Sequence, residues 1–201
     1  MSRSVHPYEP YIPEGATKLI VGTIPPYRFC TIPQTLESGD INFYYGSHDN
    51  GFWELVSIAA DMEGKLEYEN TERAIKQRME LLDKLNIGVT DIVQSCVHED
   101  QKSCDNALKD REYKALDRLL SQYPGINTLL YTSGDGGVKS FIYEQYKAEH
   151  KCVDKERREY KVCINGKEYD VILLYSPSPN ALRGVTPDKR LEQYKRIFGA
   201  R

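Results

Sequence analysis

The sequence predicts an α/β protein, a three-layer α/β/α sandwich around a central, mostly parallel sheet of roughly four to five strands. Short, continuously apolar runs alternate with longer segments whose apolar residues recur at helical spacing, which is typical of parallel strands joined by crossover helices. The apolar runs lack the alternation of a half-exposed sheet, so helices are expected on both faces. Because no linker or repeat interrupts the sequence, we expect residues 1–201 to form one domain.

The expected strands are bounded by turn residues. An extended arm is expected over residues 1–16, which are rich in Pro and Tyr and show no period. The strands that should follow are Lys18–Gly22, Ile87–Val93, Asn127–Tyr131, Tyr160–Ile164 and Glu168–Tyr175. Asn165 and Gly166 separate the last two and form a strong hairpin signal, so one antiparallel strand is expected beside the parallel ones.

The expected helices carry apolar stripes at helical spacing. They are a segment from Gly51 onward, Thr71–Leu85, Asp105–Tyr123, a segment after Gly137 that runs through about Tyr146, and Pro187–Phe198. Asn50 stands where an N-cap is expected, and Pro187 suits a first helical position. The charged residues 147–159 are expected to form a solvated connection.

Composition and charge exclude several classes of protein. A net charge of −3 argues against a protein that coats DNA through a polybasic surface. The cysteines form no C-x-x-C pair and the histidines show no metal-ligand spacing, so we expect no metal site and no cofactor. The sequence has neither a membrane-spanning apolar run nor a secretory signal. We therefore expect a cytoplasmic monomer without a membrane partner, with reduced and mostly buried thiols.

Three loops are expected to form the site, because ligands of parallel sheets bind beyond the carboxyl ends of the strands. These loops are Gly22–Asn50, Asp91–Cys104 and Ser176–Thr186. Asp91 ends a strand, and two interpretations stay open, a side chain that faces the site and one that stabilises a turn. The glycine-rich residues Ser133–Gly137 favour a tight turn before a helix over a phosphate cradle.

Three segments carry the most specific pattern, and all three adjoin these loops. They read VGTIPP at 21–26, FYYGSHDNGFW at 43–53 and YSPSPNALRG at 175–184. In order, spacing and strand context they resemble the uracil-DNA glycosylase superfamily. They most resemble its hypoxanthine-DNA (deoxyinosine) glycosylase branch, which is similar to the mismatch-specific uracil glycosylases. The second segment is the specific one.

The resemblance implies a DNA glycosylase that hydrolyses the N-glycosidic bond of a deaminated base, hypoxanthine or uracil, flipped out of DNA. The substrate would be DNA that contains a deaminated or mismatched base. The implied catalytic residues are Asn50, which positions water or base, and Asp49 as its assistant. The implied base-binding residues are Gly22, Thr23, Phe43, Tyr44 and Tyr45. The implied DNA-binding residues are Ser176, Ser178, Asn180, Arg183 and the wedge residue Leu182.

Departures from the family pattern keep other interpretations open. Ile24 stands where mismatch-type members carry Asn or Asp, and Ser47 and Gly51 replace a His and an Arg of the second motif. Ser176 stands where the last loop usually begins with His or Asn. One alternative is therefore a catalytically inactive nucleic-acid-binding protein on the same fold, and another is a hydrolase of nucleosides or small metabolites. Asn50 is equally suited to a plain helix cap.

Overall fold

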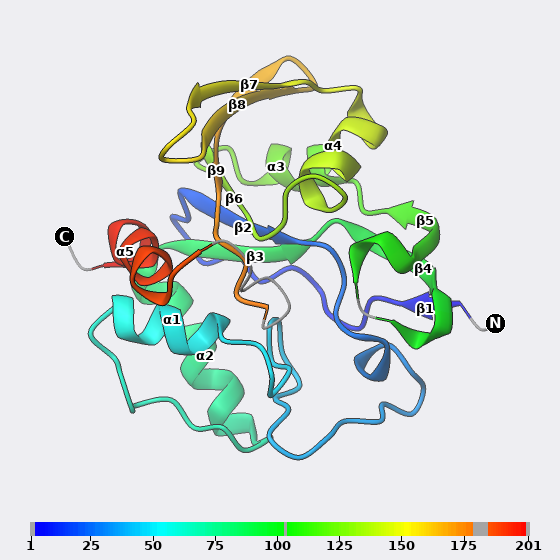
Figure 1. Ribbon diagram of the computed structural model, residues 1–201, viewed down its shortest axis with the longest axis vertical. Helices are drawn as coiled ribbons and strands as arrows, with labels where there is room; N and C mark the ends of the chain where they lie inside the picture. Colours follow the sequence, from blue (N-terminus) through cyan, green and yellow to red (C-terminus); the bar gives the residue numbers. More distant parts are fainter. Residues whose placement is uncertain (1–2, 103, 179–184, 200–201) are drawn as a thin grey trace.

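A six-stranded sheet forms the centre of the computed structural model, which describes residues 3–102, 104–178 and 185–199 (Figure 1). The strands lie in the order β3-β2-β6-β9-β8-β7. Their bounds are β2 Lys18–Gly22, β3 Ile87–Asp91, β6 Thr128–Tyr131, β7 His150–Asp154, β8 Glu159–Ile164 and β9 Lys167–Leu173. The first four strands in this order are parallel, whereas β8 and β7 are added antiparallel.

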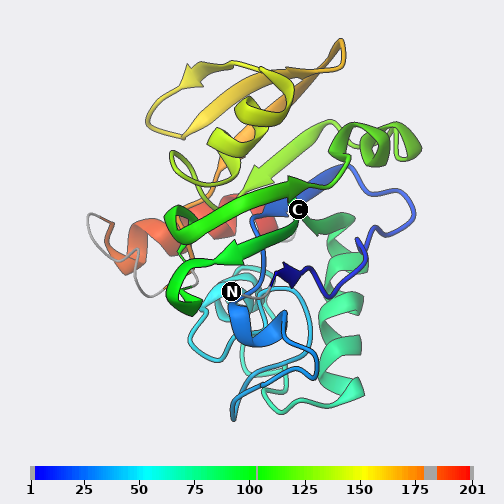
Figure 2. The same cartoon turned by 90° about the vertical axis from the view of Figure 1, so that its right-hand side faces the viewer.

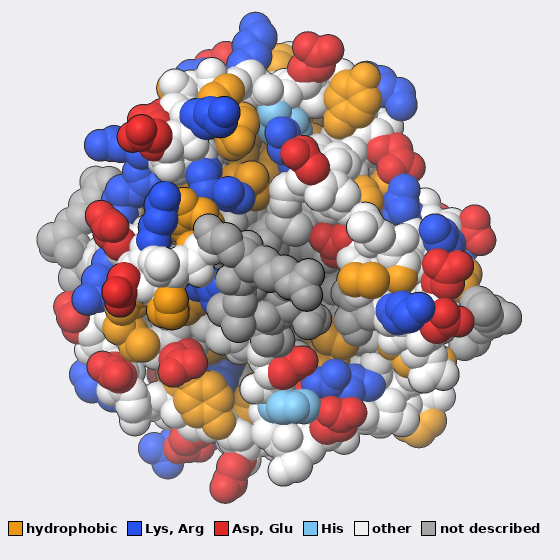
Figure 3. Space-filling model, in the orientation of Figure 1, with side chains coloured by type: hydrophobic (Ala, Val, Ile, Leu, Met, Phe, Trp, Pro, Cys, Tyr) orange, Lys and Arg blue, Asp and Glu red, His pale blue; other side chains and the backbone are white. Residues whose placement is uncertain are grey.

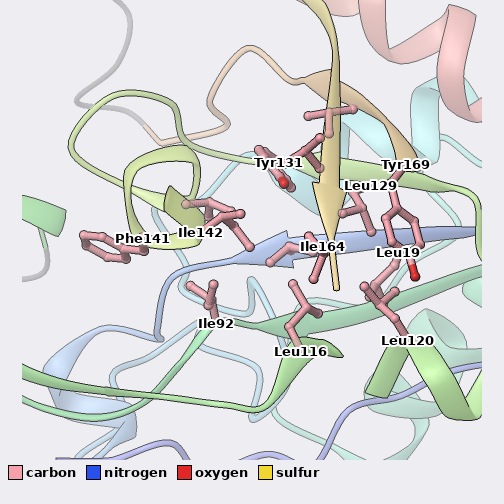
Figure 4. Packing of buried hydrophobic residues seen from close by; sticks show 14 of the residues in the cluster. Leu19, Ile92, Leu116, Leu120, Leu129, Tyr131, Phe141, Ile142, Ile164 and Tyr169 are labelled. Carbon is pink, nitrogen blue, oxygen red and sulfur yellow. The ribbon is translucent and has the colours of Figure 1, made fainter. Parts of the chain in front are cut away.

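Helices cover both faces of this sheet. One face packs against α1 (Phe52–Ala59), α2 (Glu72–Leu85) and α5 (Pro187–Phe198), and the other against α3 (Leu116–Gln122) and α4 (Val138–Tyr146). Neighbouring residues of a strand point to opposite faces, so Leu19 and Ile20 belong to different apolar clusters. Figure 4 shows Leu116 and Ile142, from α3 and α4, in the same buried cluster as Leu19 of β2. The predicted three-layer sandwich is confirmed, with six strands in place of four to five.

The predicted helix Asp105–Tyr123 is wrong over its first half. Leu108–Tyr113 forms strand β5, which pairs with β4 (Val93–His98), and β4 pairs in turn with the two-residue strand β1 (Ser4–Val5). Figure 2 shows this small antiparallel sheet in front of the main one. Its strand β5 has one face in water and many charged side chains, so no continuous apolar run marks it. The predicted strand Ile87–Val93 is likewise divided between β3 and β4.

Other expectations meet mixed outcomes. The chain over 147–159 contains β7 and is not only a solvated connection, and the hairpin at Asn165-Gly166 is confirmed. Thr71 and Thr186 cap α2 and α5 by accepting hydrogen bonds from Ala74 and Lys189. The thiols are not mostly buried, since three are exposed, those of Cys104, Cys152 and Cys163. Short 3₁₀ helices lie at Tyr27–Phe29, Glu99–Gln101 and Asp105–Ala107. Within the described residues, no helix has the length and apolarity needed to cross a membrane.

Candidate active site

A cavity of about 540 Å³ lies at the carboxyl ends of the four parallel strands. Thr23 follows β2, Asp91 ends β3, Thr132 follows β6 and Ser176 follows β9, and all four line the cavity. The long loop between β2 and α1 closes the remaining side. The volume lies in the usual range of small-molecule binding pockets. Strand-end placement predicted from sequence thus locates the cavity correctly.

The floor of the cavity holds a buried carboxylate. Asp91 is 5% exposed, and its Oδ2 lies 2.9 Å from Nε2 of His6, whose side chain is fully buried. The ammonium of Lys114 and the backbone N–H of Tyr8 lie 3.1 Å from the other ring nitrogen, Nδ1. The Tyr8 carbonyl oxygen lies 2.9 Å from the same nitrogen. Because a carboxylate only accepts hydrogen bonds, the imidazole donates to Asp91 from Nε2–H. Burial lowers the pKa of Lys114. This chain of contacts from Lys114 through His6 to Asp91, called the relay below, holds Asp91 in place in the cavity.

Sequence reasoning missed this relay. The end of β3 marked Asp91 as one of two open interpretations, and the structure supports the one in which it faces the site. Nothing in the sequence indicated His6, since it lies in the N-terminal arm and contacts Asp91 across 85 positions of the chain. The backbone N–H of His6 donates to Gln94 O at 2.9 Å, so pairing with β4 brings the arm to the floor.

Gly22 and Tyr45 complete the floor around Asp91. A Cβ on Gly22 would collide with Asp91 Oδ1 and lie 2.5 Å from the Tyr45 hydroxyl, so only glycine leaves room for these polar groups. The Tyr45 ring stacks on Phe52 with centroids 4.3 Å apart. Burial raises the pKa of Tyr45 well above its ordinary value, so the phenol is neutral and able to donate a hydrogen bond.

A Gly22→Ala variant tests this crowding. We expect it to unfold at lower urea concentration, with a loss of about 1–3 kcal/mol, because the added methyl group must displace Asp91 or Tyr45. Gly51→Ala is the matched control, since its Cβ would lie an ordinary 3.6 Å from the Pro177 carbonyl oxygen. Equal stability of the two variants would contradict the packing described here.

The aromatic residues of the second motif divide between the cavity and the core. Phe43 and Tyr45 line the cavity. Tyr44 does not, since it is 1% exposed, its ring packs against Tyr8 at 5.2 Å between centroids, and its hydroxyl donates to Glu9 O at 3.1 Å. Its predicted stacking on a base is therefore not supported by its position. Tyr44 instead secures the N-terminal arm against the body.

The rim carries Asn50 and Asp49. Asn50 Oδ1 accepts from the backbone N–H of Phe52 at 2.9 Å, so the side chain helps to cap α1 although the cap position itself is Gly51. No described residue accepts a hydrogen bond from its amide nitrogen, which leaves that N–H₂ group available to a ligand. The Asp49 carboxylate accepts a hydrogen bond from the Ser47 hydroxyl.

A buried ion pair holds this rim in place. Arg28 donates to both carboxylate oxygens of Asp40, at 2.7 and 2.8 Å, and to the Ser47 hydroxyl oxygen at 2.7 Å. Burial acts to raise the pKa of Asp40, but the hydrogen bonds from Arg28, Glu37 and His48 hold it well below its ordinary value. Glu37, Asp40 and His48 lie close enough to suggest a metal site. The guanidinium already satisfies Asp40, so we interpret the cluster as structural.

Replacing Asp40 with Asn should cost on the order of 3 kcal/mol of unfolding free energy at neutral pH, because Arg28 loses its buried counter-charge. Asp40 has a lowered pKa when folded, so its stabilisation is present above the ordinary value of 3.8 and is lost as the pH falls through the folded-state pKa. Urea unfolding of wild type and variant at pH 7 measures the loss of unfolding free energy, and the same comparison below pH 3.8 measures how much of that loss remains in acid. If the difference in unfolding free energy between wild type and variant is as large in acid as at pH 7, Asp40 does not have this role.

A second carboxylate, Asp105, lies in the cavity wall. Burial raises its pKa, while the neighbouring Thr23 and Ser133 side chains act to lower that pKa. A Cβ on Gly137 would collide with Asp105 Oδ2. Ser133 Oγ also accepts from the Val138 N–H at 2.9 Å and caps α4. The turn at Ser133–Gly137 is thus filled by a carboxylate, which supports a tight turn and argues against a phosphate cradle.

Most of the predicted site residues meet at one cavity. Ser176 and Ser178 line it, and Ser178 N–H donates to Ser176 Oγ at 3.2 Å. The loop contacts the start of α1, because Gly51 N–H donates to Pro177 O at 3.1 Å. The described residues that line the cavity as predicted are Thr23, Phe43, Tyr45, Asp49, Asn50, Ser176 and Ser178, with Gly22 directly beneath. Asn180, Leu182 and Arg183 lie outside the described residues.

Comparison with known proteins adds a likeness of fold. No protein-family model matches the sequence, and no curated protein matches it. The solution NMR structure of a protein from Methanosarcina acetivorans, described as a "putative uracil DNA glycosylase", is similar with a TM-score of 0.62 at 18% sequence identity. The similarity covers 98% of this chain and 97% of that chain. The two proteins therefore share one α/β architecture over almost their whole lengths.

Proposed function

We propose that the protein is a DNA glycosylase that hydrolyses the bond between deoxyribose and a deaminated base flipped out of DNA. The observation that carries the proposal is the cavity itself. It combines a buried acceptor, Asp91, at its floor, an aromatic wall, Phe43, and the polar residues Asp49 and Asn50 at its rim. Extruded bases are bound in such pockets by stacking and by hydrogen bonds to their edges. The likeness of fold to the Methanosarcina protein supports the same activity.

The charge at the floor suits a deaminated base. Adenine and cytosine carry a lone pair at the ring nitrogen of their pairing edge, whereas hypoxanthine and uracil carry an N–H there. A carboxylate only accepts hydrogen bonds, so Asp91 accepts from the ring N–H of a deaminated base. It repels the ring-nitrogen lone pair of adenine or cytosine and can accept only from their exocyclic amino groups. Because His6 donates to Oδ2, Oδ1 is the carboxylate oxygen left to meet the base.

The rim then meets the sugar. With the base at the floor, the C1′ atom lies toward Asn50 and Asp49. The C1′–N bond breaks, its electron pair leaves with the base, and the sugar develops positive charge. Asn50 holds a water molecule through its available amide group, and Asp49 stabilises the cation and takes the proton as the water oxygen bonds to C1′. The proton passes on to the departing base, so the products are free base and an abasic site.

The first experiment tests base release directly. Oligonucleotides that contain uracil, hypoxanthine or xanthine are incubated with the protein and then treated with alkali, which cleaves the strand at an abasic site. We expect cleavage at a deaminated base and none in undamaged DNA of the same sequence. Folded protein that cleaves at no lesion would contradict the proposal. DNA binding without release would then favour the inactive binding protein, and turnover of free nucleosides would favour the small-metabolite hydrolase.

A further inference from the structure

Two arginines from different elements lie near the residues that hold the end of β9. Arg158 directly precedes β8. It donates from Nε to Leu173 O at 2.9 Å, and its guanidinium lies over the ring of Tyr175, 4.7 Å from the centroid. Its backbone has a φ of 60°, which is uncommon for a residue other than glycine. The stacking and the hydrogen bond fix the guanidinium beside the strand that leads into Ser176.

Arg190 lies on the face of α5 that carries Gln193 and Tyr194. Burial raises the pKa of the Tyr194 hydroxyl, and the charge of Arg190 acts to lower that pKa. Arg190 is 8% exposed, and its Nε atom has no hydrogen-bond partner. The next turn of α5 is hydrogen-bonded to the end of β9, since Gln193 donates to Leu173 O at 3.1 Å and Tyr194 donates to Tyr175 O at 3.2 Å. Leu173 O thus accepts from both Gln193 and Arg158, which brings the hairpin and α5 together at this point.

Neither arginine has an acidic partner among the described residues, whereas nearby arginines do. Arg157 pairs with Asp154 at 3.8 Å, and Arg196 pairs with Glu159 at 3.1 Å. The buried Nε of Arg190 is a donor without a partner, which costs free energy, so the contacts of the described residues do not explain this side chain. Figure 3 shows Lys and Arg side chains gathered on the part of this face where β9 and α5 lie in Figure 1.

We propose that Arg158 and Arg190 form a phosphate site that binds a backbone phosphodiester of the DNA strand carrying the flipped nucleotide. The proposal rests on the function proposed above. It places the phosphate directly outside the Ser176–Ser178 loop, which lines the cavity that takes the base. Arginine presents a rigid fork of donors that matches phosphate oxygens, and a phosphate would supply the missing counter-charge. The site lies outside the three motifs on which the sequence-based site depends.

Affinity for DNA at a series of salt concentrations tests the proposal. The probe is a duplex with 2′-fluoro-2′-deoxyinosine or its uracil counterpart, because the fluorine opposes positive charge on the sugar and prevents turnover. We expect Arg158→Gln and Arg190→Gln each to weaken binding and to reduce the slope of log K against log salt by about 0.9, the value for one lost phosphate contact. Arg157→Gln, an exposed and paired control, should leave the slope unchanged.

Two further measurements separate a phosphate site from a structural role. In a series of duplexes, each phosphate near the lesion is replaced in turn by a neutral methylphosphonate. At one position the replacement should weaken DNA binding by the wild type but not by the Arg158→Gln/Arg190→Gln double variant. Without DNA, Arg190→Gln should unfold at the same or a higher urea concentration than wild type, because it removes the unsatisfied buried Nε–H. Marked destabilisation by Arg190→Gln, with an unchanged salt slope, would overturn the proposal.

The remaining outcomes also discriminate. Wild-type affinity and slope in both variants, with base release intact, would overturn the phosphate site and leave the proposed function standing. Absence of both DNA binding and base release in the wild type would overturn the two together. Inorganic phosphate provides the third arm. Phosphate could raise the melting temperature only when both arginines are present, while the variants bind DNA as tightly as the wild type. In that case the site binds a small phosphate ligand and the assignment to DNA is wrong.

Discussion

An Asn50→Ala variant is expected to release the base about 100- to 1000-fold more slowly than the wild type, the usual cost of losing one positioned donor near developing charge. The side chain has two separable roles. Its oxygen accepts from Phe52 N–H at 2.9 Å, while its amide nitrogen has no partner among the described residues. The first role supports α1, and the second serves the reaction. Single-turnover release from hypoxanthine- or uracil-containing DNA measures the reaction alone.

Asn50→Ser is the control that separates the two roles. A serine hydroxyl still accepts from the first turn of α1, so we expect its stability to match the wild type, whereas Asn50→Ala loses about 1 kcal/mol. Both variants lack the amide and should be slow. Full activity in either variant would remove Asn50 from the mechanism and leave it as a helix cap.

The second large effect is expected at Asp91. An Asp91→Asn variant keeps the size of the side chain but replaces a charged acceptor with a neutral amide. Losing a hydrogen bond to a charged group costs about 1.5–3 kcal/mol, which corresponds to roughly a 10- to 150-fold slower release of hypoxanthine or uracil. Binding of adenine- or cytosine-containing DNA should weaken less, because the amide N–H₂ can donate to the ring nitrogen of those bases.

Asp105→Asn is the matched control for Asp91→Asn. Both carboxylates line the same cavity, but Asp105 is held by Thr23 and Ser133 in the wall, away from the relay of His6 and Lys114. Release rates for the two variants are compared on the same lesions. If Asp105→Asn slows release as much as Asp91→Asn, the floor carboxylate has no special part in reading the base.

The pattern of apolar residues along the sequence predicted an element well where the element buries a continuous apolar run or stripe of its own. Pro187–Phe198 is a helix with the predicted bounds, and Lys18–Gly22 is the predicted strand, because the cause of each lies within the segment itself. Leu108–Tyr113 was missed because its charged side chains face water and its strand form depends on pairing with β4, which no local pattern encodes.

The site divides in a similar way. Strand ends and the second motif were enough to bring Thr23, Asp49 and Asn50 to one cavity. The distinction between Tyr44 and Tyr45 depended on a left-handed backbone at Tyr45, with φ of 55°, which turns adjacent rings in different directions. The relay behind Asp91 depended on tertiary contacts between distant segments, which spacing alone does not reveal.

The position of His6 in the arm has a consequence for synthesis on the ribosome. The cavity draws on residues from His6 to Ser178, so its earliest and latest parts leave the ribosome far apart in time. The parallel strands β2, β3, β6 and β9 likewise pair across long stretches of chain, and such pairing forms slowly. A chain synthesised only as far as β6 therefore has Asp91 and the rim residues Asp49 and Asn50 but lacks the Ser176–Ser178 wall, so the cavity is completed only after translation has passed Ser178.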